Sequence, residues 1–102
     1  MILNIKQQGN EYRIDVKCSR LTLAYSEELK DEVKPLLGVE GANVIIDLKG
    51  VQFIDSSGVG SLISLAKQAK VSNSTLTIEN PEQGVKELFT LLRLDLILNI
   101  RN

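Results

Sequence analysis

The feature that most constrains the fold is a short run of aliphatic and β-branched residues at positions 42–48 (ANVIIDL). A nearly continuous apolar run of this length, without Gly or Pro, is typical of a strand covered on both faces of its sheet. Such strands occur in α/β domains, where crossover helices pack on the sheet. The run therefore predicts the central strand of an α/β fold.

Four further segments have strand character. Residues 2–6 and 12–17 alternate between apolar and polar side chains on either side of Gln8-Gly9-Asn10, which predicts a β-hairpin. Residues 75–79 (TLTIE) and 96–100 (LILNI) predict two later strands.

Helical spacing of apolar residues fills the intervals between these strands. The first helix is expected over residues 26–37, with Ser26 as its N-cap and with a kink or early end at Pro35. The second begins near residue 56, and the third follows Asn80 and Pro81, which are expected as N-cap and first helical residue. The order β-β-α-β-α-β-α-β predicts one α/β domain over residues 1–102. It has a mixed, mostly parallel sheet with an N-terminal hairpin, and helices packed against the sheet.

Composition excludes several classes of function. The formal net charge of −1 and the pI of about 5.4 lack the basic excess of nucleic-acid-binding proteins. The chain has no His, which removes histidine-based catalysis and the usual zinc sites, and its single cysteine, Cys18, cannot form an intramolecular disulfide. No apolar run is long enough to insert in a membrane, so we expect a cytoplasmic protein. We also expect no catalytic residues, no metal and no cofactor.

The segment with most chemical content is residues 54–60 (IDSSGVG), where a strand-like connector meets a helix start. Asp55, Ser56 and Ser57 are all capping-type residues, so helix capping is the simplest interpretation. One cap needs only one side chain, however, and a hydroxyl in a first helical turn is a place where a phosphate would meet free N–H groups. The dinucleotide-binding fingerprint is incomplete because Ile63 takes its last glycine position, and no serine-nucleophile elbow is present.

Residues 44–60 resemble the central strand and switch loop of the STAS domain, a family typified by bacterial anti-sigma factor antagonists. Weaker similarity lies at Arg20-Leu21, at Glu28-Leu29 and at residues 76–80. The family often has Gly at Ser19, after the second helix and at Arg93, and an acidic residue at Thr22. The resemblance implies that Ser57 is phosphorylated by a partner kinase, whereas the unphosphorylated form binds that partner.

The resemblance also implies the partners of this chain. These are a kinase-type anti-sigma factor or related serine kinase, and a cognate phosphatase, with no nucleic acid and no membrane insertion. The residues expected at the partner-binding surface are Thr22, Asp55, Ser56, Ser57 and Gly58. Two other functions are open. The chain could be an unphosphorylated STAS subunit of a signalling or lipid-transport assembly, or it could bind a small ligand at the carboxyl ends of the strands. A weak homodimer is left open.

Several residues receive the simpler of two interpretations. Asp47 is a secondary candidate for shaping a pocket with Asp55, although an acid at a strand end commonly bonds nearby loop N–H groups. Cys18 is expected to fill space, and Lys67 and Lys70 to be solvated helix charges. Tyr25 and Phe53 are expected to pack, unless Phe53 proves to be exposed beside Ser57.

Overall fold

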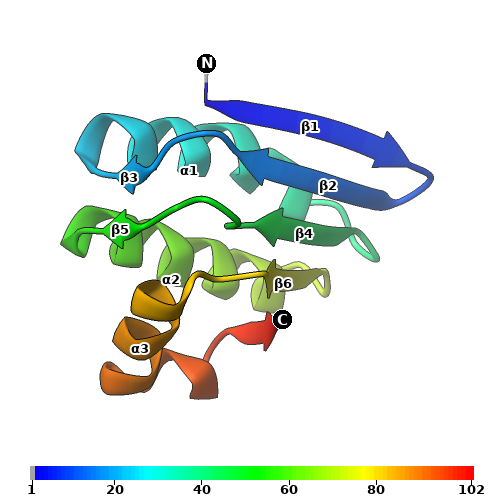
Figure 1. Ribbon diagram of the computed structural model, residues 1–102. Helices are drawn as coiled ribbons and strands as arrows, with labels where there is room; N and C mark the ends of the chain where they lie inside the picture. Colours follow the sequence, from blue (N-terminus) through cyan, green and yellow to red (C-terminus); the bar gives the residue numbers. More distant parts are fainter. Residues whose placement is uncertain (1) are drawn as a thin grey trace.

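The computed structural model describes residues 2–102 and shows an α/β domain with three α-helices (Figure 1). The elements, in chain order, are β1 (Leu3–Gln8), β2 (Glu11–Val16), β3 (Arg20–Leu21), α1 (Leu23–Leu37), β4 (Asn43–Asp47), β5 (Phe53–Ile54), α2 (Ser56–Val71), β6 (Thr75–Glu79), α3 (Gln83–Leu91), the 3-10 helix η1 (Leu94–Leu96) and β7 (Asn99–Arg101).

The main sheet has the strand order β1-β2-β4-β6-β7. The strands β1 and β2 pair antiparallel through the turn at Gly9, whose positive φ of 62° suits glycine, and this confirms the predicted hairpin. The remaining pairs, β2 with β4, β4 with β6 and β6 with β7, are parallel. The predicted mixed, mostly parallel sheet is therefore confirmed, with β4 at its centre.

The hydrophobic core lies between the sheet and the helices. In Figure 1, α1 and α2 lie side by side on the far side of the sheet. Alternate residues of the central strand, Val44 and Ile46, are fully buried and belong to the same apolar cluster as Leu29 of α1 and Leu65 of α2. Val85 and Phe89 of α3 extend that cluster. The period-2 pattern of the strands and the 3.6-residue pattern of the helices thus meet in one core.

The second face of β4 is covered by a side chain of the neighbouring strand β2. Ile45 pairs in register with Arg13 of β2 on one side and with Thr77 of β6 on the other. The Arg13 guanidinium reaches Glu79 on β6, so the Arg13 side chain must cross β4. Ile45 is only 5% exposed, and an arginine stem over it explains how an aliphatic residue is buried there.

Two helix starts differ from their predicted positions. The helix α1 begins at Leu23 with Thr22 as N-cap, so Ser26 lies inside the helix and is buried rather than capping it. The helix α3 begins at Gln83 with Glu82 as N-cap, not at Asn80-Pro81. Asn80 instead adopts a left-handed conformation, with φ 55°, and its side chain donates a hydrogen bond to Asp47 at 3.3 Å.

The last part of the chain also departs from the predicted strand at residues 96–100. Arg93 adopts a left-handed conformation, η1 follows, and the strand is confined to Asn99–Arg101. A left-handed residue after a helix is usually glycine, which accounts for the family preference at Arg93. Pro35 does not end α1 early, because the helix continues to Leu37, where Gly38 is the C-cap.

A second, two-stranded sheet was not predicted. The strands β3 and β5 pair in parallel, Arg20 with Phe53 and Leu21 with Ile54, within what the sequence suggested was a connector. This pairing brings the residues that precede α1 beside the residues that precede α2. It therefore places Thr22 and Asp55 at the same end of the domain, where the backbone N–H of Asp55 donates to the carbonyl of Leu21 at 3.3 Å.

Candidate functional site

The predicted site lies at the first turn of α2, and its geometry is set by one carboxylate. Asp55 is the N-cap in an extended conformation, and its Oδ1 accepts a hydrogen bond from the N–H of Gly58 at 3.0 Å. The same oxygen accepts the hydroxyl of Ser57 at 2.5 Å. The capping interpretation is thus confirmed for Asp55, which in addition holds the Ser57 hydroxyl.

The charge on Asp55 determines the direction of this hydrogen bond. The Ser57 hydroxyl and, next, the Gly58 N–H lower the pKa of Asp55 below its ordinary value. The carboxylate is therefore ionised at neutral pH and can only accept. Ser57 must use its one proton toward Asp55, so its oxygen lone pairs are left free to face other groups.

One such group is Ser26, in the middle of the contact between α1 and α2. The Ser26 oxygen lies 3.4 Å from the Ser57 oxygen, and Ser26 is 1% exposed. Because the Ser57 proton is directed to Asp55, the Ser26 hydroxyl is the donor of this pair. One turn further along α2, the Ser61 hydroxyl donates to the Ser26 carbonyl at 3.1 Å. Three serines thus form a polar contact between α1 and α2. We call Ser26, Ser57 and Ser61 the serine seam.

Gly58 is required by the close approach of α2 to β3 and β5. A Cβ on Gly58 would lie 2.5 Å from Cγ2 of Ile54 and 3.0 Å from the carbonyl oxygen of Leu21. The first distance is shorter than real Cβ contacts, and the second is tighter than most of them, so the neighbouring atoms would have to shift. Gly58 therefore allows the first turn of α2 to rest against the two short strands, which positions Ser57 beside Ser26.

The remaining predicted residues lie around Ser57. Ser56 is the first residue of α2 and is exposed, whereas Ser57 is half-buried. Thr22 is the N-cap of α1, but its side chain makes no capping hydrogen bond. The structure thus brings Thr22, Asp55, Ser56, Ser57 and Gly58 to one end of the molecule.

An exposed apolar and cationic edge adjoins this site. Phe53 is 41% exposed, contrary to the expectation that it packs, and the Arg20 guanidinium stacks over its ring at 4.2 Å. Tyr25, in the first turn of α1, is also exposed, contrary to the expectation that it packs, and so is Leu23. We call Arg20, Leu23, Tyr25 and Phe53 the aromatic edge. The positive charge of Arg20 also contributes to lowering the pKa of Asp55.

Sequence reasoning missed the serine seam and the stacking of Arg20 on Phe53. The four-residue spacing of Ser57 and Ser61 places them on one helix face and is a signal that could have been used. Ser26 carried no such signal, because it became significant only through the packing of α1 on α2.

The secondary candidates keep their simpler interpretations. Asp47 accepts the N–H of Lys49 at 2.9 Å, and its other partners are Arg13 and Asn80. Cys18 packs against the core, and burial raises the pKa of its thiol, which makes it a weaker nucleophile. Lys67 and Lys70 are exposed.

Within residues 2–102 no three acidic, Cys or His side chains gather as they would to hold a metal ion. No helix in the same part of the chain combines the length and apolarity needed to cross a membrane.

Comparison with known families agrees with this geometry. The family model described as "Mlab, STAS domain" matches residues 3–99. The chain belongs to the STAS family. This STAS chain is 30% identical over 100 residues to the anti-sigma-B factor antagonist of Bacillus subtilis, an alignment that covers 98% of the chain and 92% of that relative. It is thus a homologue of anti-sigma factor antagonists, which are regulatory binding proteins.

Solved STAS structures share the fold. An anti-sigma-factor antagonist domain protein of Planctomyces limnophilus superposes with a TM-score of 0.86 at 18% identity, covering 98% of this chain and 89% of that one. The anti-sigma factor antagonist SpoIIAA in its unphosphorylated form gives 0.78 at 15% identity, covering 98% and 88%. The phosphorylated form of SpoIIAA from Bacillus gives 0.74 at 14% identity, covering 98% and 91%. The predicted single-domain STAS fold is confirmed.

Proposed function

We propose that this STAS protein is an anti-sigma factor antagonist that docks a kinase-type anti-sigma factor and is released when Ser57 is phosphorylated. The observation that carries the proposal is the Ser57 hydroxyl, half-buried in the first turn of α2 and held by the ionised Asp55. A solved protein of the same fold exists in unphosphorylated and phosphorylated forms, which supports a phosphorylation site in such a domain.

The surface around Ser57 suits a protein partner. The aromatic edge exposes Leu23, Tyr25 and Phe53 beside a hydroxyl-rich helix start, and Arg20 adds a cation. Aromatic and arginine side chains are enriched at protein interfaces, because they combine apolar area with directed polar groups. A partner that covers this edge also covers Ser57.

Release follows from the charge that phosphorylation adds. A phosphoserine carries about −1.5 to −2 charges at pH 7. It would stand next to the ionised Asp55, whose bond from the Ser57 hydroxyl is lost when that oxygen becomes an ester. Inside an interface, desolvation and like-charge repulsion each cost several kcal/mol, and every 1.4 kcal/mol is about tenfold in affinity. The partner is therefore expelled, and a phosphatase that removes the phosphate restores binding.

Phosphate mapping tests the proposal. The protein is incubated with ATP and the kinase-type anti-sigma factors of its own source, and the modified residue is located by mass spectrometry. We expect the phosphate on Ser57, loss of incorporation in Ser57→Ala and normal incorporation in the matched control Ser56→Ala. Modification of Ser56, Thr22 or Thr75 instead would overturn the assignment. A chain that stays unmodified with every kinase favours the alternative, an unphosphorylated STAS subunit of a larger assembly.

A further inference from the structure

Arg20 is an exposed cation at the same end of the molecule as Ser57. Within residues 2–102 it forms no salt bridge. Its guanidinium lies over the ring of Phe53, 4.2 Å from the ring centroid. A contact with the face of a ring leaves the N–H donors at the edge of a guanidinium available to an anion. Arg20 therefore retains the capacity to bind one.

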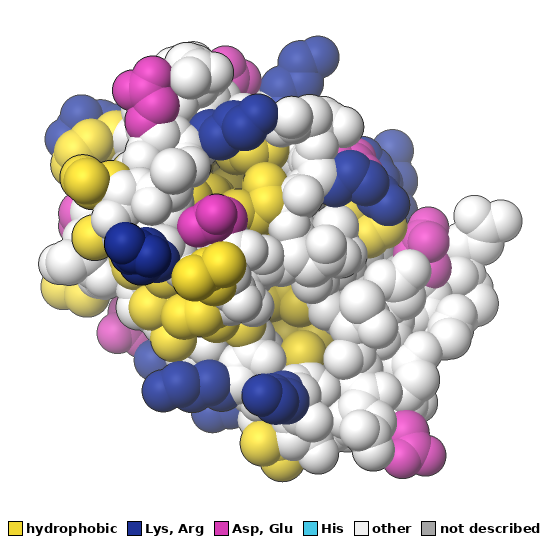
Figure 2. Space-filling view, turned by 90° about the horizontal axis from the view of Figure 1, so that it is seen from below, with side chains coloured by type: hydrophobic (Ala, Val, Ile, Leu, Met, Phe, Trp, Pro, Cys, Tyr) yellow, Lys and Arg dark blue, Asp and Glu magenta, His cyan; other side chains and the backbone are white. Residues whose placement is uncertain are grey.

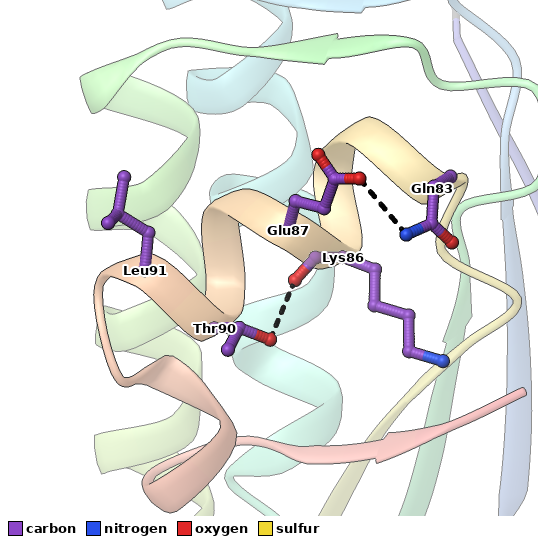
Figure 3. A pocket seen from close by; sticks show the side chains of 5 residues that line it. All are labelled: Gln83, Lys86, Glu87, Thr90 and Leu91. Carbon is purple, nitrogen blue, oxygen red and sulfur yellow. Dashed lines mark hydrogen bonds between the residues drawn. The ribbon is translucent and has the colours of Figure 1, made fainter.

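The exposed groove along α3 shows a different situation. Figure 2 shows the face on which α3 lies, where hydrophobic side chains gather between basic and acidic ones. In the groove (Figure 3), the Gln83 amide donates to Glu87 at 3.1 Å, and the Thr90 hydroxyl donates to the Lys86 carbonyl at 3.1 Å. These bonds join residues four apart in one helix, and they account for the side chains without a ligand.

The pairing of β3 with β5 (Figure 1) places Arg20 near Asp55. Arg20 lies opposite Phe53 in this parallel pair, and both side chains are exposed. The next residues, Leu21 and Ile54, are buried, as the alternation of a strand requires. Asp55 continues β5 in an extended conformation, and its N–H donates to the Leu21 carbonyl. Asp55 therefore lies on the face of Phe53, two residues along and diagonal to Arg20.

A guanidinium of this chain covers a longer path than that. Arg13 on β2 pairs with Glu79 on β6, which lies two strands away and two residues along. From Arg20 to Asp55 the path crosses only one strand spacing. The Ser57 hydroxyl lowers the pKa of Asp55 most, and the charge of Arg20 adds to that effect. The Ser57 oxygen, which is bonded to Asp55, is therefore within range of the Arg20 guanidinium.

We propose that Arg20 is the phosphate-binding residue of the switch, and that its guanidinium moves from the ring of Phe53 to the phosphate of phosphorylated Ser57. This inference rests on the proposed phosphorylation of Ser57. A guanidinium binds a phosphate through two parallel charge-assisted hydrogen bonds, which are stronger than an exposed cation–π contact. The move takes the Arg20 charge away from a docked partner and leaves Phe53 bare. Phosphorylation thus changes the aromatic edge as well as the charge at Ser57.

Phosphorus NMR of protein that carries phosphoserine at position 57 tests the inference. The phosphoserine is installed during synthesis, so that no kinase is needed. We expect the phosphate to titrate about half a pH unit higher in Arg20→Gln than in the unsubstituted chain, because the cation that favours the dianion is lost. Lys70→Gln is the matched control. It removes an exposed charge from the last turn of α2, roughly 20 Å along the helix from Ser57, and should leave the titration unchanged.

Proton NMR of the Arg20 side chain provides the second arm. Stacking on Phe53 shifts the Arg20 methylene protons upfield, and Phe53→Leu identifies this ring effect by abolishing it. The upfield shift should be lost when position 57 carries phosphoserine. Equal titration of Arg20→Gln and Lys70→Gln would overturn the inference, and so would an upfield shift that persists with phosphoserine. Both results are independent of whether a kinase modifies Ser57, so failure here is distinguishable from failure of the proposed function.

Discussion

At the scale of single residues, the site depends on the direction of two hydrogen bonds. Asp55 is ionised and accepts the Ser57 proton, and Ser26 is then left to donate to the Ser57 oxygen. In the proposed phosphoserine the Ser57 proton is gone, so the first bond would be lost and the second donor would stay in place. We therefore expect Ser26 to donate to an oxygen of that phosphoserine.

This arrangement predicts a specific effect of Ser26→Ala. The second pKa of phosphoserine, ordinarily about 6, should be higher in the variant, because a hydrogen bond that stabilises the dianion is lost. Titration of phosphorylated protein followed by ³¹P NMR measures this pKa. Ser61→Ala is the control, since its hydroxyl bonds the Ser26 carbonyl and not the Ser57 oxygen. Both variants should lose about 1 kcal/mol of stability. Identical phosphate titrations in the two would refute the role of Ser26.

At the scale of elements, the position of α2 depends on the lack of a side chain at Gly58. Gly58→Ala forces a methyl group against Ile54 and the Leu21 carbonyl, and should destabilise the fold by about 1–3 kcal/mol. Gly60→Ala lies in the same helix with nothing within 4 Å of its new Cβ, and should stabilise by up to about 1 kcal/mol. Urea unfolding of both variants gives the two free energies. Equal shifts in the same direction would mean that the close approach at Gly58 does not constrain α2.

The elements also show which parts of the structure the sequence could predict. The strands β4 and β6 and the hairpin carry a local periodicity, and they were predicted to within a residue or two. The start of α1 was missed because Leu23 and Tyr25 are exposed and add nothing to the apolar pattern. The strands β3 and β5 are two residues long and exist through pairing between distant segments. Similarly, Asp55 and Ser57 are neighbours in sequence and were found, whereas Ser26 joins them only in the folded chain.

At the scale of the whole molecule, three charged side chains form a row across the sheet: Arg13 on β2, Glu79 on β6 and Arg101 on β7. We call this row the charged ladder. Glu79 accepts hydrogen bonds from Arg13 and Arg101, and these bonds, that of Arg13 first, lower the pKa of Glu79. Since the pKa in the folded state is below that in the unfolded chain, the ladder stabilises the fold above the ordinary Glu pKa of about 4.3. That stability is lost as the pH falls through the folded-state pKa.

Arg13→Gln should therefore lower the free energy of unfolding at pH 7. In this variant the free energy of unfolding should also fall less between neutral and acid pH than it does in the unsubstituted protein. Urea unfolding at a series of pH values measures both quantities. Lys30→Gln is the control, because Lys30 forms an exposed pair with Glu27 at 3.7 Å that contributes little. If Arg13→Gln kept the full acid dependence of the unsubstituted protein, the stabilising role of the ladder would be wrong.

The most direct test of the central claim is the affinity for the kinase-type anti-sigma factor, measured by titration calorimetry with Ser57 in different charge states. Ser57→Ala leaves the surface neutral and should bind within a few-fold of the unphosphorylated protein. Ser57→Asp imitates part of the phosphate charge and should bind at least about tenfold more weakly, a difference of about 1.4 kcal/mol, with the phosphorylated protein weaker still. Equal affinity of the Ala, Asp and phosphorylated forms would contradict a switch that works through charge at Ser57.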